Sequence, residues 1–202
     1  MLAFLAFGLC VSSVYLLNDL LDLEDDRHHP VKRKRPFASG ALPIAWYAAL
    51  SPALLAVSIA IAIACCALPW RFAAVLLGYY ALTLAYSFYL KKQVMLDVVV
   101  LAALYSARMI AGAAAIGMHM TFWLLAFSMF MFLSLAFAKR YTELHAMQAR
   151  GVEKTRGRGY LASDLSLISS LGTASGYLAV LVLALYIQDA RTAALYRSPQ
   201  LI

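Results

Sequence analysis

Long apolar runs separated by short polar segments dominate the chain. An α-helix needs roughly 20 apolar residues to cross the hydrocarbon core of a bilayer. Five runs reach this length, at about 44–68, 72–90, 94–117, 121–138 and 164–188. A sixth run, residues 1–18, is nearly uncharged and lacks the basic start and small-residue cleavage site of a signal peptide. The six runs together predict an all-α, polytopic transmembrane helix bundle of about six spans.

Composition and charge agree with a membrane protein. Hydrophobic residues make up 64% of the chain and charged residues only 13%, whereas soluble domains are about half apolar and about a quarter charged. A net charge of +7 would suggest nucleic acid as the partner of a soluble protein. Here the basic residues fall between apolar runs. Anionic lipid headgroups or phosphorylated substrates are therefore the expected partners, and nucleic acid is not.

The loops between the six runs divide lysine and arginine unevenly. Loops 19–43, 91–93 and 139–163 would lie on one side of the membrane and hold 13 of these residues. Loops 69–71 and 118–120, with the C-terminal tail, would lie on the other side and hold 3. By the positive-inside rule the first side faces the cytoplasm. Because nine of the ten acidic residues lie on that side or within one turn of it, the chemistry is expected there.

Three aspartates follow the first apolar run at helical spacing. At about 100° per residue, Asp19, Asp22 and Asp26 fall within about 60° of one another on one helical face. Carboxylates this close repel one another, and hard oxygen ligands suit Mg²⁺, which also bridges to substrate phosphates. A solvated acidic helix end is the alternative, although acids at a helix C-terminus oppose the helix dipole.

Five basic residues come immediately after these acids, in the segment R-H-H-P-V-K-R-K-R-P-F-A-S-G at 27–40. Carboxylates that hold a metal ion, followed by cations that hold phosphate, form the arrangement that a diphosphate site requires. His28 and His29 are alternative metal ligands, but beside so many carboxylates we expect them to be ordinary loop residues.

These motifs resemble those of a known family. The pattern N-D-x-x-D-x-x-x-D at 18–26, followed by R-P-F-A-S-G, is similar to the first signature of the UbiA superfamily of intramembrane prenyltransferases. The resemblance implies a catalytic Mg²⁺ held by Asp19, Asp22 and Asp26, with Asn18 also binding the metal and diphosphate. It further implies phosphate contacts from Lys34 and Arg35.

A second element of the same family resembles Y-S-x-x-L-K, at 86–91 in this chain. The resemblance implies that Lys91 approaches the phosphates. From the residues alone, tyrosine and lysine at this depth serve equally well as an interfacial belt and a snorkelling anchor.

Two ionisable residues lie in the fourth run. Asp97 and Arg108 are 11 positions apart, so they fall within about 20° on one helical face. An arginine this deep in a span faces the bundle interior or a polar cavity. It either lines a substrate chamber or pairs with a carboxylate of another helix. The pattern L-D-x-x-x-L-A-x-x-Y-S-x-R-x-x-A-G resembles the family's, which favours the chamber and substrate binding by Arg108.

The fifth run ends in K-R-Y-T-E-L at 139–144. Lys139 and Glu143 have the spacing of a simple helical salt bridge. UbiA members carry a second motif, D-x-x-x-D, at this point. Here Lys139 and Glu143 stand at the positions of its two aspartates, which leaves one carboxylate, so a second full Mg²⁺ site is not expected. K-R-Y-x-E-L instead resembles the branch that transfers phosphoribose from phosphoribosyl pyrophosphate to a polyprenyl phosphate in bacterial cell-wall synthesis. This implies substrate binding by Lys139, Arg140 and Glu143, in a bacterial inner membrane.

The predicted function is a Mg²⁺-dependent transferase acting on a polyprenyl phosphate or diphosphate, with phosphoribosyl pyrophosphate as donor. The first alternative is an aromatic-acceptor prenyltransferase of the 4-hydroxybenzoate type. The second is a membrane carrier, which a buried Arg108 would suit, although carriers place coupling sites near the midplane on broken helices. Residues 1–202 are expected to form a single, partial UbiA-like domain with six of nine helices, from the family's second to its seventh.

Overall fold

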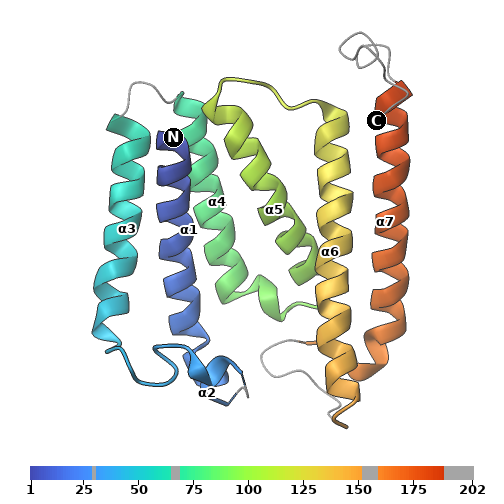
Figure 1. Ribbon diagram of the computed structural model, residues 1–202, viewed down its shortest axis with the longest axis horizontal. Helices are drawn as coiled ribbons and strands as arrows, with labels where there is room; N and C mark the ends of the chain where they lie inside the picture. The colour runs from blue at the N-terminus through green and yellow to red at the C-terminus, as the bar shows by residue number, and fades with distance from the viewer. Residues whose placement is uncertain (29–30, 65–68, 152–158, 189–202) are drawn as a thin grey trace. The chain divides into compact units, whose positions relative to one another are not determined.

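A computed structural model of the chain describes residues 1–28, 31–64, 69–151 and 159–188. Within these residues every regular element is helical (Figure 1). Three short 3₁₀ turns accompany the α-helices: η1 (Lys32–Lys34), η2 (Leu90–Lys92) and η3 (Ala162–Asp164). The α-helices are α1 (Leu2–Leu21), α2 (Leu23–His28), α3 (Ala45–Ala64), α4 (Trp70–Phe88), α5 (Leu96–Ala115), α6 (Phe122–Gln148) and α7 (Leu165–Gln188).

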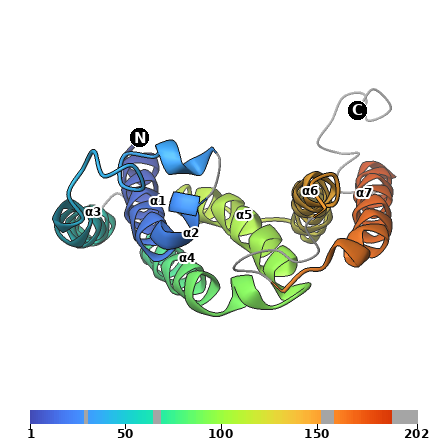
Figure 2. The same cartoon turned by 90° about the horizontal axis from the view of Figure 1, so that it is seen from below.

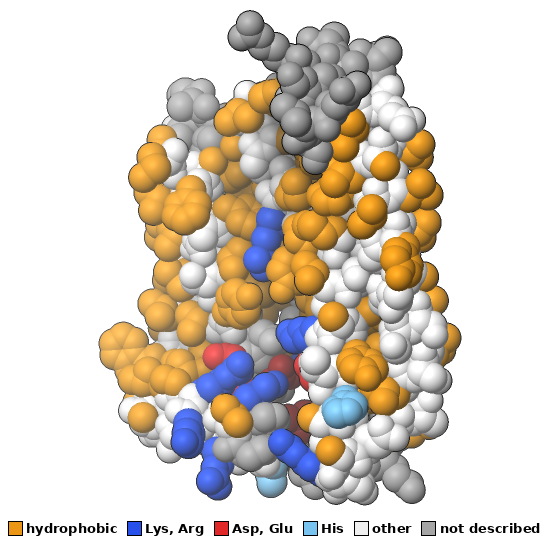
Figure 3. Space-filling view, turned by 45° about the vertical axis from the view of Figure 1, so that its right-hand side comes forward, with side chains coloured by type: hydrophobic (Ala, Val, Ile, Leu, Met, Phe, Trp, Pro, Cys, Tyr) orange, Lys and Arg blue, Asp and Glu red, His pale blue; other side chains and the backbone are white. Residues whose placement is uncertain are grey.

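Six of the described helices, all except α2, are long and apolar enough to cross a membrane. Only 17–28% of the residues in their most hydrophobic windows are buried inside the protein, so most apolar side chains face outward. Figure 3 shows hydrophobic side chains along the helices and most lysine and arginine side chains near helix ends. In water this exposure would be unfavourable, whereas in lipid it is expected. The predicted membrane-spanning, all-α fold is therefore confirmed, and the chain is a membrane protein.

The first compact unit comprises Met1–Lys91 and Met109–Met118. In it α1 packs against α3 and α4, which lie beside it in Figures 1 and 2. Serine hydroxyls join the backbones of α1 and α3: Ser13 Oγ donates to Ser51 O at 2.7 Å, and Ser58 Oγ donates to Ala6 O at 2.6 Å. Small hydroxyl-bearing residues let helices approach closely where lipid supplies no hydrophobic drive. These contacts hold α1, whose end carries the predicted acidic motif.

The second unit comprises Lys92–Arg108 and the residues from His119 onward. Its α6 and α7 pack along their lengths (Figure 1), and glycines of α7 permit the close approach. A Cβ placed on Gly172 would lie 3.0 Å from the Cβ of Phe137, and one on Gly176 would lie 3.2 Å from Ser134 Oγ. The Ser134 hydroxyl donates to Gly172 O at 2.9 Å. This tight helix pair positions the C-terminal turns of α6.

Two helix boundaries differ from the sequence expectation. The helix α6 continues to Gln148, so the K-R-Y-T-E-L segment is helical and does not begin a loop. The helix α1 ends at Leu21, Asp22 adopts φ −95° and ψ 5°, and α2 restarts the helix at Leu23. The restart has an electrostatic reason, since it places Glu24, Asp25 and Asp26 in the first turn of a new helix, where the dipole favours acids.

Candidate active site

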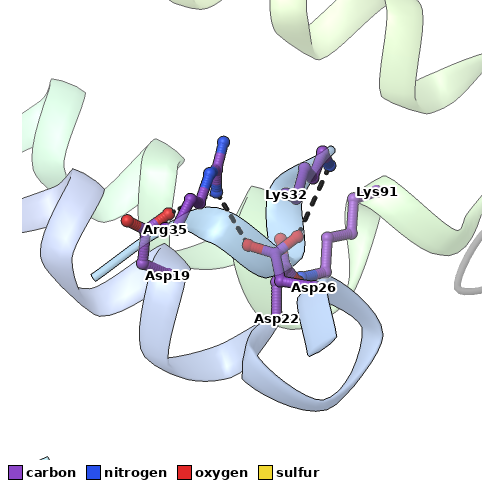
Figure 4. Close-up of polar contacts among 6 residues, drawn as sticks. All are labelled: Asp19, Asp22, Asp26, Lys32, Arg35 and Lys91. Atoms are coloured by element: carbon purple, nitrogen blue, oxygen red, sulfur yellow. Dashed lines mark hydrogen bonds and ion pairs between the residues drawn. The ribbon is translucent and has the colours of Figure 1, made fainter. Parts of the chain in front are cut away.

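The break at Asp22 reshapes the acidic motif. Asp19 lies in the last turn of α1, Asp22 at the break and Asp26 in α2. The sequence predicts that the three share one continuous helical face, and in the structure they do not. Backbone hydrogen bonds from Asp22 N to Asn18 O at 2.9 Å and from Asp26 N to Asp22 O at 2.8 Å keep the chain turning through the break. The carboxylates consequently stay in one region, which Figure 4 shows.

One guanidinium nitrogen joins two of these carboxylates. Nη1 of Arg35 donates to Asp19 Oδ1 at 2.7 Å and to Asp26 Oδ2 at 2.8 Å (Figure 4). Asp26 is buried, and Lys32 Nζ lies 3.6 Å from its other oxygen. Two cations thus offset the charge of a carboxylate that burial alone would disfavour.

The 3₁₀ turn η1 selects which basic residues reach the acids. With three residues per turn, positions i and i+3 eclipse, so Lys32 and Arg35 both reach Asp26. Arg33 and Lys34, between them, are exposed. The structure therefore brings Arg35 to the acidic motif, whereas Lys34 is exposed. That these two residues contact phosphate stays a prediction. Lys32 was missed because four consecutive basic residues offer no signal for choosing among them.

Lys91 reaches the third carboxylate. Its Nζ lies 2.5 Å from Asp22 Oδ1, and the side chains are 12% and 27% exposed, respectively. It lies in η2, directly after α4, whereas its neighbour Lys92 is exposed. The structure therefore places Lys91 at the acidic motif, and its approach to substrate phosphates stays a prediction.

The donors of this motif fit a hard divalent cation. Asp19 and Asp26 direct oxygens at a single point, which Arg35 Nη1 occupies. Oδ1 of Asn18 is buried and accepts no hydrogen bond from the described residues. Carboxylate and amide oxygens are the ligands that Mg²⁺ takes. Among the described residues no three His, Cys, Asp or Glu side chains are already grouped for a metal, so these side chains would have to move together to hold one.

A separate network of charges lies in the second unit. Arg140 of α6 donates through Nη2 to Asp97 Oδ2 of α5 at 2.5 Å, with side chains 1% and 0% exposed. Its Nη1 donates to Glu143 Oε2, one turn further along α6. The sequence suggests a Lys139–Glu143 pair, whereas the structure pairs Glu143 with Arg140. Lys139 is exposed.

Tyr160 completes this network from the segment before α7. Its hydroxyl donates to Asp97 Oδ1 and accepts from Met95 N at 3.0 Å. Burial raises the pKa of Tyr160, and its hydrogen bond to Asp97 raises that pKa further. The phenol therefore stays protonated and able to donate. Tyr160 was missed because it follows a polar connector with no recognisable pattern.

Arg108 has aromatic neighbours. Its guanidinium carbon lies 5.0 Å from the centre of the Tyr105 ring, and that ring stacks on Phe132 of α6. Asp97, which the helical spacing aligns with Arg108, pairs with Arg140 instead. The prediction that Arg108 lines a substrate chamber stays a prediction.

In the described part of the chain, six helices are long and apolar enough to cross a membrane, and paired carboxylates and cations lie at the end of α1. These features define an integral membrane protein whose site suits a cation or a phosphate. The sequence matches the UbiA prenyltransferase family over residues 1–198, and the chain belongs to that family. The predicted UbiA resemblance is therefore confirmed.

The chain is also similar to individual proteins with known names. The chain is 39% identical over 187 residues to the nodulation protein NoeC of Azorhizobium caulinodans, and this match covers 93% of this chain and 60% of that protein. It is 39% identical over 150 residues to decaprenyl-phosphate phosphoribosyltransferase of Mycobacterium tuberculosis, covering 74% and 49%. The chain spans about half the length of the curated relatives it matches.

A solved structure shares the fold. A UbiA homologue from Archaeoglobus fulgidus, bound to DMAPP and Mg²⁺, superposes with a TM-score of 0.79 over 96% of this chain and 69% of that chain. At 16% sequence identity this likeness establishes the helical arrangement only.

Proposed function

We propose that this chain carries the catalytic motif of a Mg²⁺-dependent intramembrane transferase, which moves phosphoribose from phosphoribosyl pyrophosphate to a polyprenyl phosphate. The observation that carries the proposal is the acidic motif at the end of α1, where Arg35 bridges Asp19 and Asp26 and Lys91 pairs with Asp22. Relatives named decaprenyl-phosphate phosphoribosyltransferase, 34–39% identical to the chain, support the choice of phosphoribose as the transferred group and of a polyprenyl phosphate as the acceptor.

The charges of the motif suit departure of a pyrophosphate. Mg²⁺, held by Asp19, Asp22 and Asp26 with Asn18, would offset the negative charge that develops on the leaving group. Arg35 and Lys91 already lie beside these carboxylates and would turn their donors to phosphate oxygens. An oxygen of the lipid phosphate would form the new bond to the ribose carbon. The bond from that carbon to pyrophosphate would break, and its electron pair would leave with pyrophosphate.

Substrate binding by Lys139 and Glu143 of the second unit is proposed from the family resemblance alone. Lys139 is exposed at the C-terminal part of α6, and Glu143 is partly exposed one turn further. At the positions of the family's second motif, a lysine and a glutamate present less negative charge than two aspartates. Such a site suits a donor that carries more phosphate groups.

The location proposed for this chemistry is the cytoplasmic face of a bacterial inner membrane. Thirteen lysines and arginines on one set of loops, against three on the other, support this orientation. The acidic motif, Lys91 and the end of α6 all belong to the basic set of loops.

Prenyl transfer to an aromatic acceptor is the second candidate. It is favoured by the fold neighbours from Archaeoglobus fulgidus, which were solved with DMAPP or GPP and Mg²⁺. In that reaction the same carboxylates and cations would assist departure of diphosphate from an allylic chain.

Product identity separates the candidates. Membranes containing the protein would receive Mg²⁺ and labelled polyprenyl phosphate with phosphoribosyl pyrophosphate, or labelled prenyl diphosphate with 4-hydroxybenzoate. The proposal expects a lipid-linked phosphoribose that disappears in EDTA and in Asp22→Asn, but persists in the matched control Asp25→Asn, whose residue is exposed. A prenylated aromatic product would favour the second candidate. Uptake of unmodified label by proteoliposomes would instead indicate a carrier.

A further inference from the structure

The burial of Arg140 is unusual for a phosphate ligand. Its side chain is 1% exposed, and both Nη atoms are already engaged, one by Asp97 and one by Glu143. The third nitrogen, Nε, has no hydrogen-bond partner among the described residues but is buried as well. For the guanidinium to meet a phosphate it would have to move out of this buried position and strand Asp97, which is fully buried. Breaking a buried pair in this way leaves an uncompensated charge, which is strongly unfavourable.

Asp97 holds that guanidinium through Nη2, whereas Glu143 accepts from Nη1, and Tyr160 contacts both Asp97 and the guanidinium. Asp97 accepts from Arg140 and from the Tyr160 hydroxyl on its two oxygens, so both of its oxygens have donors. The guanidinium carbon of Arg140 lies 5.2 Å from the centre of the Tyr160 ring, a cation–π contact. The arginine is thus fixed by a carboxylate and by an aromatic face.

The backbone around the network is built to keep Tyr160 in place. Met95 adopts φ 68°, a conformation that a residue with a side chain rarely takes, and its N–H donates to the Tyr160 hydroxyl. A Cβ on Gly159 would lie 2.9 Å from Val94 Cγ2 and 3.1 Å from Lys92 O, so Gly159 itself fits closely against the residues that lead into α5. Such outliers persist only where the surroundings fix them.

Glu143 is the exposed member of the network. Its side chain is 38% exposed, whereas those of Asp97 and Arg140 are buried and Tyr160 is buried as well. One buried carboxylate suffices to balance the charge of Arg140. The bond from Nη1 to Glu143 therefore adds orientation to a carboxylate that remains accessible to a ligand.

We propose that Asp97 and Tyr160 are positioning residues, which lock Arg140 so that it orients the Glu143 carboxylate for the substrate, and that Arg140 does not itself bind phosphate. This inference rests on the proposed function, in which Glu143 contacts the substrate. It assigns to Asp97 and Tyr160 a role in turnover and changes the role expected of Arg140.

A double-mutant cycle tests whether Arg140 acts through Glu143. The protein in membranes would be assayed as wild type, Arg140→Gln, Glu143→Gln and the double variant, with kcat/KM measured for phosphoribosyl pyrophosphate. If Arg140 acts through Glu143, the double variant loses no more than Glu143→Gln alone, within about twofold. If the two losses multiply, Arg140 acts independently of Glu143 and the inference is overturned.

Tyr160→Phe gives a milder second test, because the ring stays and only the hydroxyl is removed. We expect kcat to fall about tenfold, as for loss of an outer partner that orients a ligand, with the KM of both substrates unchanged. Adding Tyr160→Phe to Glu143→Gln should cause no further loss. The matched control is Tyr177→Phe, at an outward-facing position of α7. Thermal unfolding of each purified variant identifies any that fail to fold.

The outcomes also separate this inference from the proposed function. Wild-type protein that yields no lipid-linked phosphoribose overturns the proposed function and, with it, the role of this network in turnover. Two results with an active wild type would overturn the inference alone. One is a Tyr160→Phe variant that keeps its kcat. The other is a Tyr160→Phe change that raises the KM for phosphoribosyl pyrophosphate further when it is added to Glu143→Gln.

Discussion

Lys91 Nζ and Asp22 Oδ1 lie 2.5 Å apart although 69 positions separate the two residues in the chain. The lysine follows α4 and the aspartate lies where α1 breaks, so the pairing depends on how α1 and α4 pack. It brings together two motifs that the sequence shows only as separate features. It also gives the acidic motif a cation whose long side chain can move between carboxylate and phosphate.

Replacing Lys91 should therefore impair turnover much more than replacing its neighbour. In Lys91→Met we expect kcat/KM for phosphoribosyl pyrophosphate to fall by about 100-fold, the size typical for loss of one donor to a developing negative charge. Lys92→Met is the matched control, since Lys92 is exposed in the same turn. Initial-rate measurements on both variants check this prediction. Equal losses would mean that the two lysines act only through general surface charge.

Arg35 should matter for stability chiefly when no divalent cation is present. In Arg35→Gln, Asp19 and the buried Asp26 lose their shared donor. Because Arg35 is 43% exposed, the loss is screened, and we expect about 1 kcal/mol in EDTA. Excess Mg²⁺ should restore most of this stability by taking the position between the carboxylates. Thermal unfolding with EDTA or Mg²⁺ measures it.

Arg33→Gln is the control for that experiment, because Arg33 lies in η1, which directly precedes Arg35, and is exposed. It should unfold as the wild type does in both conditions. A deficit of Arg35→Gln that Mg²⁺ leaves unchanged would show that Asp19 and Asp26 do not share a cation site.

The membrane spans could be predicted because the bilayer itself fixes their length and apolarity. The run at 44–68 corresponds to α3, with residues 65–68 outside the described part of the chain, and the run at 72–90 corresponds to α4 within a few residues at each end. The end of α6 was missed because the same hydropathy signal marks only the part of a helix that lies in lipid. Hydropathy falls at Lys139, where the chain leaves the lipid, but the helix continues to Gln148 because its hydrogen bonds do not depend on an apolar surrounding.

The acidic motif could be located from local spacing, whereas its partners could not. Spacing within one helix cannot reveal that the chain breaks at Asp22, or that Lys91 pairs with that residue. The Tyr160–Asp97 hydrogen bond joins residues 63 positions apart, so nothing local predicts it. An aspartate at the start of a span was a visible signal that some partner exists, but only packing decides that the partner is Arg140.

Gly172 should be required for the packing of α7 on α6. In Gly172→Ala the new Cβ would lie 3.0 Å from the Cβ of Phe137, an atom that cannot move away without shifting α6. Overpacking of this kind costs about 1–3 kcal/mol. Gly8→Ala is the contrast, since no other atom lies within 4 Å of its added Cβ and alanine favours a helix over glycine. Detergent-denaturation midpoints should fall for the first and not for the second.

The raised pKa of Tyr160 predicts a loss of stability at alkaline pH. The ordinary pKa of tyrosine is near 10, and burial with the hydrogen bond to Asp97 raises that of Tyr160 in the folded protein. Below about pH 10 the phenol is protonated in both folded and unfolded states, so its stabilisation is fully present. Above pH 10 the unfolded phenol ionises while the folded one stays neutral, so unfolding releases a proton and stability falls as pH rises. The free-energy difference between wild type and Tyr160→Phe should therefore be constant from pH 7 to about 10 and shrink above it, whereas Tyr177→Phe should show no such change. A difference that stays constant up to pH 11 would mean that the Tyr160 hydroxyl is not held in the buried hydrogen bond to Asp97.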